Sequence, residues 1–177
     1  NKEGAGGMIG SAFAAKLPPD GSSMLVATTP FVVGPIMQSN TSYDPIKDFS
    51  AVGRIAVNPL ALTVNAQVPA HSMKELIDYA RKNPGALTYA SSGPGTPSQL
   101  EMENLKAQLK LDIREIPYRS NAQALTDVIA GTVSMYYTVQ STALSNVQAG
   151  RVRALAVAAS KPTSALPAVP TLGQAAG

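Results

Sequence analysis

The sequence predicts an α/β fold in which strands and helices alternate along the chain. From residue 60 to residue 159, short apolar segments typical of strands alternate with amphipathic segments of roughly ten residues that are typical of helices. Residue types that begin and end helices stand at the borders of these segments. The chain has 177 residues, of which 45% are hydrophobic and 14% charged, so it can bury a substantial core. These observations favour βα units on a largely parallel sheet.

The first sixty residues are less regular than the rest. A glycine-rich start leads into a short alanine-rich helix, and the turn Pro18-Pro19-Asp20-Gly21 follows it. We expect strands at residues 23–28, 49–57 and 60–64, the last two separated by Asn58-Pro59. At the other end, residues 161–177 are rich in Pro and Ala and are not expected to form a complete terminal element.

The middle of the chain carries the clearest helix signals. A helix over residues 71–85 is expected because Ser72 and Glu75 form a capping-box pair and Asn83-Pro84-Gly85 ends it. After a strand at 87–90, a second helix is expected to open at Thr96, with Pro97 in its first turn. The pattern then repeats, with strands at 113–118, 133–139 and 153–159 and with helices from Ser120 to Gly131 and over 141–149.

Composition excludes several classes of function. The absence of cysteine excludes disulfides, thiolate metal ligands and a cysteine nucleophile, and a single histidine, His71, excludes sites that need several imidazoles. The net charge of +3 comes from scattered basic residues, which argues against nucleic acid as a partner. The longest uncharged run, residues 21–43, contains two prolines and many polar side chains, so no transmembrane helix is expected. We expect no cofactor and no metal.

The loop at residues 91–98 has the most distinctive chemistry. It follows a strand and precedes a helix, so the first amides of that helix and the positive end of its dipole point into the loop. A neutral loop of this kind favours reversible binding of a small carboxylate. A plain strand-to-helix connection with a good cap explains the same residues equally well. The candidate residues are Ser91, Ser92, Gly93, Gly95, Thr96, Pro97 and Ser98.

The remaining candidates give little support to catalysis. The glycine-rich stretches at residues 4–10 and 93–98 lack the spacing of a dinucleotide-binding motif, and no serine stands in a nucleophile elbow. Glu101 and Glu103 point to different sides of a helix and are interpreted as surface residues. Of Tyr136-Tyr137, one ring could reach a cleft, but packing of both rings is slightly favoured. Since no set of acid, base and nucleophile emerges, we expect a protein that is not an enzyme.

A series of short motifs spans almost the whole chain and points to a family. In this respect the sequence resembles the Bug-type, or TctC-like, periplasmic solute-binding proteins of tripartite tricarboxylate transporters. The motifs are Gly4-Ala5-Gly6-Gly7 with Ile9-Gly10, Pro19-Asp20-Gly21, residues 43–49 (YDPIKDF), residues 89–100 (YASSGPGTPSQL), Ile116-Pro117-Tyr118, residues 124–127 (ALTD) with Gly131, residues 149–157 (AGRVRALAV) and residues 166–171 (LPAVPT).

The resemblance implies a two-lobed, periplasmic-binding-protein-like fold of the type II, or flytrap, class. Residues 1–58 and 161–177 would form part of a first lobe, and residues 59–160 would form the second lobe. The chain would cross between the lobes near Asn58-Pro59 and near residues 160–162. Because relatives carry a first strand before the segment that matches Asn1 and continue past Gly177, the first lobe is expected to be incomplete.

The resemblance also implies where a ligand would bind. The loop at 91–98 corresponds to a ligand-facing loop of the second lobe, and Thr28 and Thr29 correspond to a ligand-facing segment of the first. Thr138 stands where many relatives have Asp after an aromatic residue, so the resemblance gives a ligand contact at this position less support.

The function implied by the resemblance is transport. The protein would capture a small organic carboxylate or dicarboxylate between its lobes and deliver it to membrane transporter subunits, working in the periplasm. Full-length members of the family are expected to be monomers, whereas an incomplete first lobe would expose sheet edge and apolar surface through which copies could associate. The alternative is a ligand-sensing or assembly domain of the same fold without a role in transport.

Overall fold

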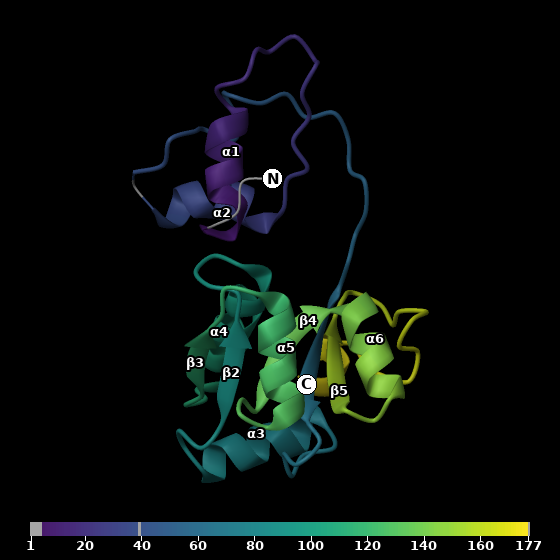
Figure 1. Cartoon of the computed structure of the whole chain (residues 1–177). Helices are drawn as coiled ribbons and strands as arrows, with labels where there is room; N and C mark the ends of the chain where they lie inside the picture. The colour runs from purple at the N-terminus through teal and green to yellow at the C-terminus, as the bar shows by residue number, and fades with distance from the viewer. Residues whose placement is uncertain (1–4, 39, 177) are drawn as a thin grey trace.

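The computed structural model describes residues 5–38 and 40–176, and within them it confirms the α/β prediction (Figure 1). The described residues form a five-stranded sheet in the order β3-β2-β4-β1-β5. Strand β2 pairs in parallel with β3 and β4, whereas β1 runs antiparallel to both β4 and β5. The sheet is therefore mixed rather than largely parallel as expected, because the reversed strand β1 makes two of the sheet's four pairings antiparallel. The strands are β1 (Leu60–Asn65), β2 (Thr88–Ser91), β3 (Arg114–Pro117), β4 (Met135–Val139) and β5 (Val152–Ala158).

The helices that the sequence predicts after residue 60 are present, with ends shifted by a few residues. They are α3 (Met73–Lys82), α4 (Pro97–Leu109), α5 (Asn121–Ala130) and α6 (Gln140–Gln148). The hydroxyl of Ser72 accepts a hydrogen bond from the Glu75 amide at 3.2 Å, as a capping box requires. The Glu75 carboxylate instead accepts from the His71 amide, one residue earlier than the motif predicts. Thr96 and Ser120 also stand at the N-cap positions of α4 and α5, as the sequence predicts, but neither makes a side-chain capping hydrogen bond.

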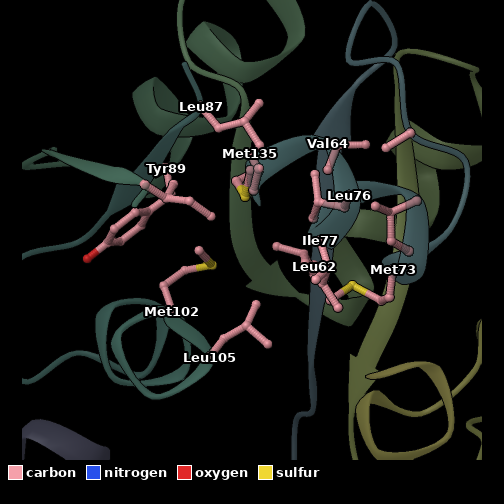
Figure 2. Close-up of a cluster of buried hydrophobic side chains, with 14 of the residues drawn as sticks. Leu62, Val64, Met73, Leu76, Ile77, Leu87, Tyr89, Met102, Leu105 and Met135 are labelled. Carbon is pink, nitrogen blue, oxygen red and sulfur yellow. The ribbon is translucent and has the colours of Figure 1, made fainter. Parts of the chain in front are cut away.

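Two layers of helices cover the two faces of the sheet. Because side chains alternate along a strand, Tyr89 and Ala90 of β2 point to opposite faces. On one face, α3 and α4 pack over the strands, and Figure 2 shows the resulting core. On the other face, α5 and α6 cover smaller clusters. Fully buried members of the main core include Leu62, Val64, Met73, Leu76, Tyr89, Met102 and Met135.

Residues 5–58 form a separate and looser arrangement above the sheet in Figure 1. They contain the single 3-10 turn η1 (Ala5–Gly7) and the helices α1 (Met8–Ala14) and α2 (Thr29–Met37) among their described residues. Packing here centres on three rings, with Phe31 and Tyr43 stacked at 5.5 Å and Phe49 set edge-on against both. The Tyr43 hydroxyl also donates to the Phe31 carbonyl at 2.8 Å.

The strands predicted at residues 23–28 and 49–57 are wrong for this structure. Both segments are non-helical and carry no strand pairing within the described part of the chain. Most of their apolar side chains are exposed, for example Val52 at 88% and Met24 at 84%, whereas Leu25 and Phe49 are half-buried. A β-strand needs a neighbour to bond with, and the described residues offer these two segments none.

The tail of the chain lies elsewhere than the expected first lobe. Residues 161–176 pack on the same sheet as residues 59–160, with Thr171 bridging Val157 on edge strand β5 and Leu166 packing against Ala61 and Ala143. A short helix of five residues, α7 (Leu172–Ala176), ends the described tail, where no complete terminal element was expected. Grouping this segment with residues 1–58 therefore disagrees with these contacts, because its apolar side chains and backbone find partners on β5. The lobe boundaries themselves stay a prediction.

Candidate functional site

The loop that joins β2 to α4 lies at the carboxyl end of β2 and points toward residues 5–58 (Figure 1). Gly93 and Gly95 have φ values of 98° and 73°, a left-handed conformation that favours glycine. Thr96 is the N-cap of α4 and Pro97 is its first residue, as the sequence predicts. The predicted loop residues are therefore brought together, with Ser91, Gly95, Thr96 and Ser98 buried and with Ser92, Gly93 and Pro97 half-buried.

The starts of α2 and α4 meet at the glycine-rich turn η1. A Cβ atom on Gly6 would lie 3.2 Å from the side chain of Pro30, at the start of α2, and 3.6 Å from the Cγ2 atom of Thr96. Thr28 is the N-cap of α2 and Thr29 is its first residue, and both are exposed. Two helix N-termini with positive dipole ends therefore lie on either side of one junction. Thr28 and Thr29 directly precede Pro30, on the α2 side of this junction.

Most of the loop amides already have partners within the protein. The Ser92 amide donates to the Ser98 hydroxyl at 3.1 Å, and the Gly93 amide donates to the Ser91 hydroxyl at 3.1 Å. The Gly95 amide donates to the side-chain oxygen of Gln99 at 2.8 Å. A half-buried backbone amide needs such a partner. In this structure these three amides hold the loop in shape.

A second polar group borders the loop and was not expected from the sequence. The hydroxyls of Ser92 and Tyr136 both donate to the Oδ1 atom of Asn121, at 2.5 and 2.9 Å. This arrangement turns the amide nitrogen of Asn121, an exposed residue at the start of α5, away from them. Burial raises the pKa of Tyr136 despite its hydrogen-bonding neighbours, so its hydroxyl is a donor at neutral pH.

The two adjacent tyrosines of β4 have different surroundings. Both rings are buried, as the slightly favoured interpretation holds, but the hydroxyl of Tyr136 reaches the polar loop. Tyr137 lies in the main core, and its hydroxyl is a buried polar atom without a hydrogen-bond partner among the described residues. Burial also raises the pKa of Tyr137. The alternation of side chains along β4 therefore gives one tyrosine to the core and one to the site.

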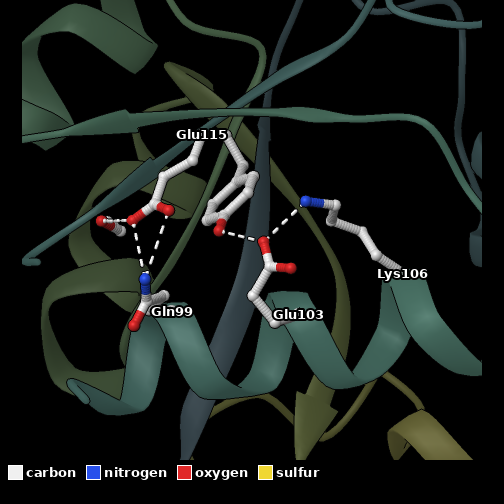
Figure 3. Close-up of polar contacts among 6 residues, drawn as sticks. Gln99, Glu103, Lys106 and Glu115 are labelled. Carbon is white, nitrogen blue, oxygen red and sulfur yellow. Dashed lines mark hydrogen bonds and ion pairs between the residues drawn. The ribbon is translucent and has the colours of Figure 1, made fainter. Parts of the chain in front are cut away.

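Beneath the loop, Glu115 of β3 accepts hydrogen bonds from two loop-supporting side chains, as Figure 3 shows. The Ser91 hydroxyl donates to its Oε1 atom at 2.5 Å, and the Gln99 amide donates to both carboxylate oxygens at 3.2 Å. Further along α4, Tyr89 and Lys106 donate to Glu103. Burial acts to raise the pKa of Glu103, but these hydrogen bonds outweigh it and lower the pKa.

Thr138 is buried in β4, opposite Ala61 of β1. It stands two residues after Tyr136, which pairs with Ala90 of β2 in the parallel register, so it lies at the sheet edge from which the loop leaves. The described residues also contain no group of three or more His, Asp or Glu side chains placed to hold a metal ion. Nor do they include a helix that is both long and apolar enough to cross a membrane.

Sequence comparison places this chain in a known family. Residues 1–176 match the family described as "Tripartite tricarboxylate transporter family receptor". A protein of Pseudomonas sp. (strain P51), the UPF0065 protein in the tcbD–tcbE intergenic region, is 37% identical over 177 residues, which is 100% of this chain and 53% of that protein. The chain thus spans about half the length of this relative.

Solved structures agree with this assignment. A protein solved as "a periplasmic transporter" superposes with a TM-score of 0.91 and 34% identity, over 98% of this chain and 59% of the other. R. palustris Rpa4515, solved with adipate, gives a TM-score of 0.90 at 31% identity, over 99% and 59% of the two chains. MatC from Rhodopseudomonas palustris, with bound malate, gives a TM-score of 0.83 at 27% identity, over 97% of this chain and 59% of the other.

These comparisons confirm the predicted fold class. The chain has the α/β fold of the periplasmic binding proteins, and it matches only part of the two-lobed structures. The matching family consists of receptors rather than enzymes, in agreement with the sequence-based expectation. The family match covers 176 of the 177 residues, and the superposition on the periplasmic transporter structure supports it. The chain therefore belongs to the tripartite tricarboxylate transporter receptor family.

Proposed function

We propose that this chain carries the ligand-binding loop of a periplasmic solute-binding protein, which captures a small organic carboxylate or dicarboxylate and delivers it to tripartite tricarboxylate transporter subunits in the membrane. The observation that carries the proposal is the convergence of the starts of α2 and α4 on η1, at the border between residues 5–58 and the sheet. Helix N-termini and hydroxyl groups favour a small anion without requiring a fixed positive charge nearby.

The polar groups at this border suggest how a carboxylate would be held. Thr28 and Thr29 offer exposed hydroxyls from the α2 side. From the other side, the outward-turned amide of Asn121 offers a neutral donor, and the Ser92 and Tyr136 hydroxyls orient it by donating to its oxygen. Adipate and malate in the related structures are both dicarboxylates, which supports a ligand of this class.

Binding is tested by thermal melts and calorimetry with adipate, malate and citrate, and with adipamide as the uncharged control. A ligand at a hundred times its dissociation constant adds about 2.7 kcal/mol of stability, which should raise Tm by several degrees for a chain of this size. We expect at least one carboxylate, and not adipamide, to do so. A cooperatively melting sample that responds to no carboxylate would contradict the proposal.

The site assignment is tested with a matched pair of variants. Removing the hydroxyl in Ser92→Ala should weaken carboxylate binding by about tenfold, because Asn121 loses the hydroxyl that orients its amide toward the ligand. Thr126→Ala is the control: it removes an exposed hydroxyl that only bonds the Ala122 carbonyl within α5. Equal carboxylate affinities of the two variants would show that the ligand does not bind at this loop.

Periplasmic location and delivery are separate parts of the proposal. Fractionation of cells that make the protein from its natural gene should place it in the periplasm. Delivery predicts that the carboxylate-loaded protein increases uptake into vesicles that hold the transporter subunits, whereas the protein without ligand does not. Uptake that is independent of this protein would favour the sensing or assembly alternative.

Self-association through residues 5–58 also stays a proposal. All large hydrophobic residues that are strongly exposed in the described chain lie between Ile9 and Val57. Such a surface favours association. Light scattering after size-exclusion chromatography should show a mass that rises with concentration, and Ile55→Lys should reduce it. A monomer at all concentrations would contradict this part.

A further inference from the structure

Glu115 stands at the base of the β2–α4 loop but is not part of it. It lies on edge strand β3, opposite Tyr89 in the parallel register with β2. Its carboxylate accepts the three hydrogen bonds from Ser91 and Gln99, and no basic side chain is recorded as its partner in the described chain (Figure 3). Both donor side chains are neutral, and each also accepts a hydrogen bond from a backbone amide of the loop. The carboxylate therefore acts on the loop backbone through the side chains of Ser91 and Gln99.

The direction of these hydrogen bonds matters. Because the Ser91 hydroxyl gives its hydrogen to Glu115, the Ser91 oxygen is free to accept from the Gly93 amide. Because the Gln99 amide group faces the carboxylate, its carbonyl oxygen faces the Gly95 amide. The Glu115 carboxylate, which can only accept, thus orients the Ser91 and Gln99 oxygens. These oxygens accept from the amides of Gly93 and Gly95, the two glycines with left-handed backbone.

We propose that Glu115 is a positioning residue for ligand binding, which holds the β2–α4 loop in the shape that receives a carboxylate. The inference rests on the proposed function of that loop. The other loop contacts, from Ser98 to Ser92 and from Thr96 to Gly93, lie within the loop or the first turn of α4. The hydrogen bonds from Glu115 through Ser91 and Gln99 instead connect both glycines to strand β3. Hydrogen bonds to a charged carboxylate are stronger than those between neutral groups.

The test uses Glu115→Gln, which keeps the size of the side chain and breaks the order of donors and acceptors. Its single carbonyl oxygen can accept from Ser91, but its amide then faces the amide of Gln99, two donors against each other. We expect solvent exchange of the Gly93 and Gly95 amides, measured by NMR, to rise about tenfold while exchange of β4 amides stays unchanged.

A swapped double variant separates positioning from simple loss of a contact. It combines Glu115→Gln with Gln99→Glu. Ser91 then donates to the carbonyl oxygen of the amide introduced on β3, and the nitrogen of that amide donates to the carboxylate introduced on α4. The same carboxylate accepts from the Gly95 amide, so every donor again meets an acceptor at unchanged net charge. The swap should restore slow exchange, whereas Gln99→Glu alone, which opposes two carboxylates, should not.

Glu103→Gln is the matched control, because Glu103 of α4 accepts from Tyr89 of β2 and from Lys106 and has no hydrogen bond to the loop among the described residues. It should leave exchange at Gly93 and Gly95 unchanged. Unchanged exchange in Glu115→Gln, or failure of the swap to restore it, overturns the role of Glu115.

Carboxylate affinity is the second measurement and uses adipate and malate as probes. Where wild type binds one of them, Glu115→Gln should weaken binding about tenfold and the swap should recover it; full affinity in Glu115→Gln overturns the proposal. Wild type that binds neither probe counts against the proposed function instead. Glycine exchange in the ligand-free protein then decides by itself whether Glu115 holds the loop.

Discussion

Residues 5–58 and residues 59–176 differ in packing much more than in residue type. Val64 of β1 is fully buried, whereas Val52 is 88% exposed, although both stand in apolar segments that favour strands. The difference is the presence of neighbours: β1 bonds with β4 on one side and β5 on the other, and the 49–57 segment bonds with no strand in the described chain. Apolar sequence alone therefore does not create a core.

Ionisable groups show the same contrast. In α4, burial raises the pKa of Glu101. In residues 5–58, hydrogen bonds from the Ile46 and Lys47 amides lower the pKa of Asp44, which is exposed. Desolvation therefore sets the direction of the pKa shift at Glu101, and local hydrogen bonds set it at Asp44.

The largest expected effect is a loss of stability on truncating a core side chain. Leu62→Ala should lower the free energy of unfolding by about 2–5 kcal/mol, because Leu62 is fully buried in the main cluster and a cavity would remain. Ile55→Ala, at a residue that is 82% exposed, should change it by less than about 0.5 kcal/mol. Urea unfolding measures both. Similar losses would show that residues 49–57 are packed in solution, which would break the contrast.

A glycine in α2 tests whether residues 5–58 are packed at all. A Cβ on Gly34 would come within 2.0 Å of the Met8 sulfur, so the Met8 side chain must move aside and Gly34→Ala should cost about 1 kcal/mol through overpacking between α1 and α2. In a loose helix the same change would instead gain up to about 1 kcal/mol of helix propensity. Gly173→Ala in α7, where the added Cβ meets no atom within 4 Å, is the control. A gain at Gly34 would mean that α1 and α2 do not pack in solution.

The smallest expected effect concerns pH. The raised pKa of Glu101 means that its contribution to stability is present below its unfolded value of about 4.5 and is lost as pH rises through the folded pKa. Glu101→Gln should therefore stabilise the protein at pH 7, by less than about 1 kcal/mol after solvent screening, and not at pH 4. Urea unfolding at the two pH values measures the difference.

Asp44→Asn provides the opposite sign. The lowered pKa of Asp44 gives a contribution that is present above about 3.8 and is lost as pH falls through the folded pKa. This variant should be slightly less stable than wild type at pH 7 and equal to it at low pH. If both variants changed the free energy of unfolding at pH 7 in the same direction, the different burial of Glu101 and Asp44 would not explain their behaviour.

Local chemistry in the sequence was enough to predict the alternating elements after residue 60. Capping at Ser72, the proline at the start of α4 and the periodic apolar faces each act over a few residues, so they are visible without a fold. The loop at 91–98 was found for the same reason, since its glycines, hydroxyls and helix start are neighbours in the chain.

Only the tertiary structure decided which distant residues complete the loop. Glu115, Asn121 and Tyr136 come from β3, α5 and β4, and the order and register of the sheet set their distances from Ser91 and Ser92. The position of residues 161–176 and the unpaired state of 23–28 and 49–57 likewise depend on what lies next to them. Helix signals are local because each bond spans four residues, whereas strand pairing and polar networks join residues that are far apart in the chain.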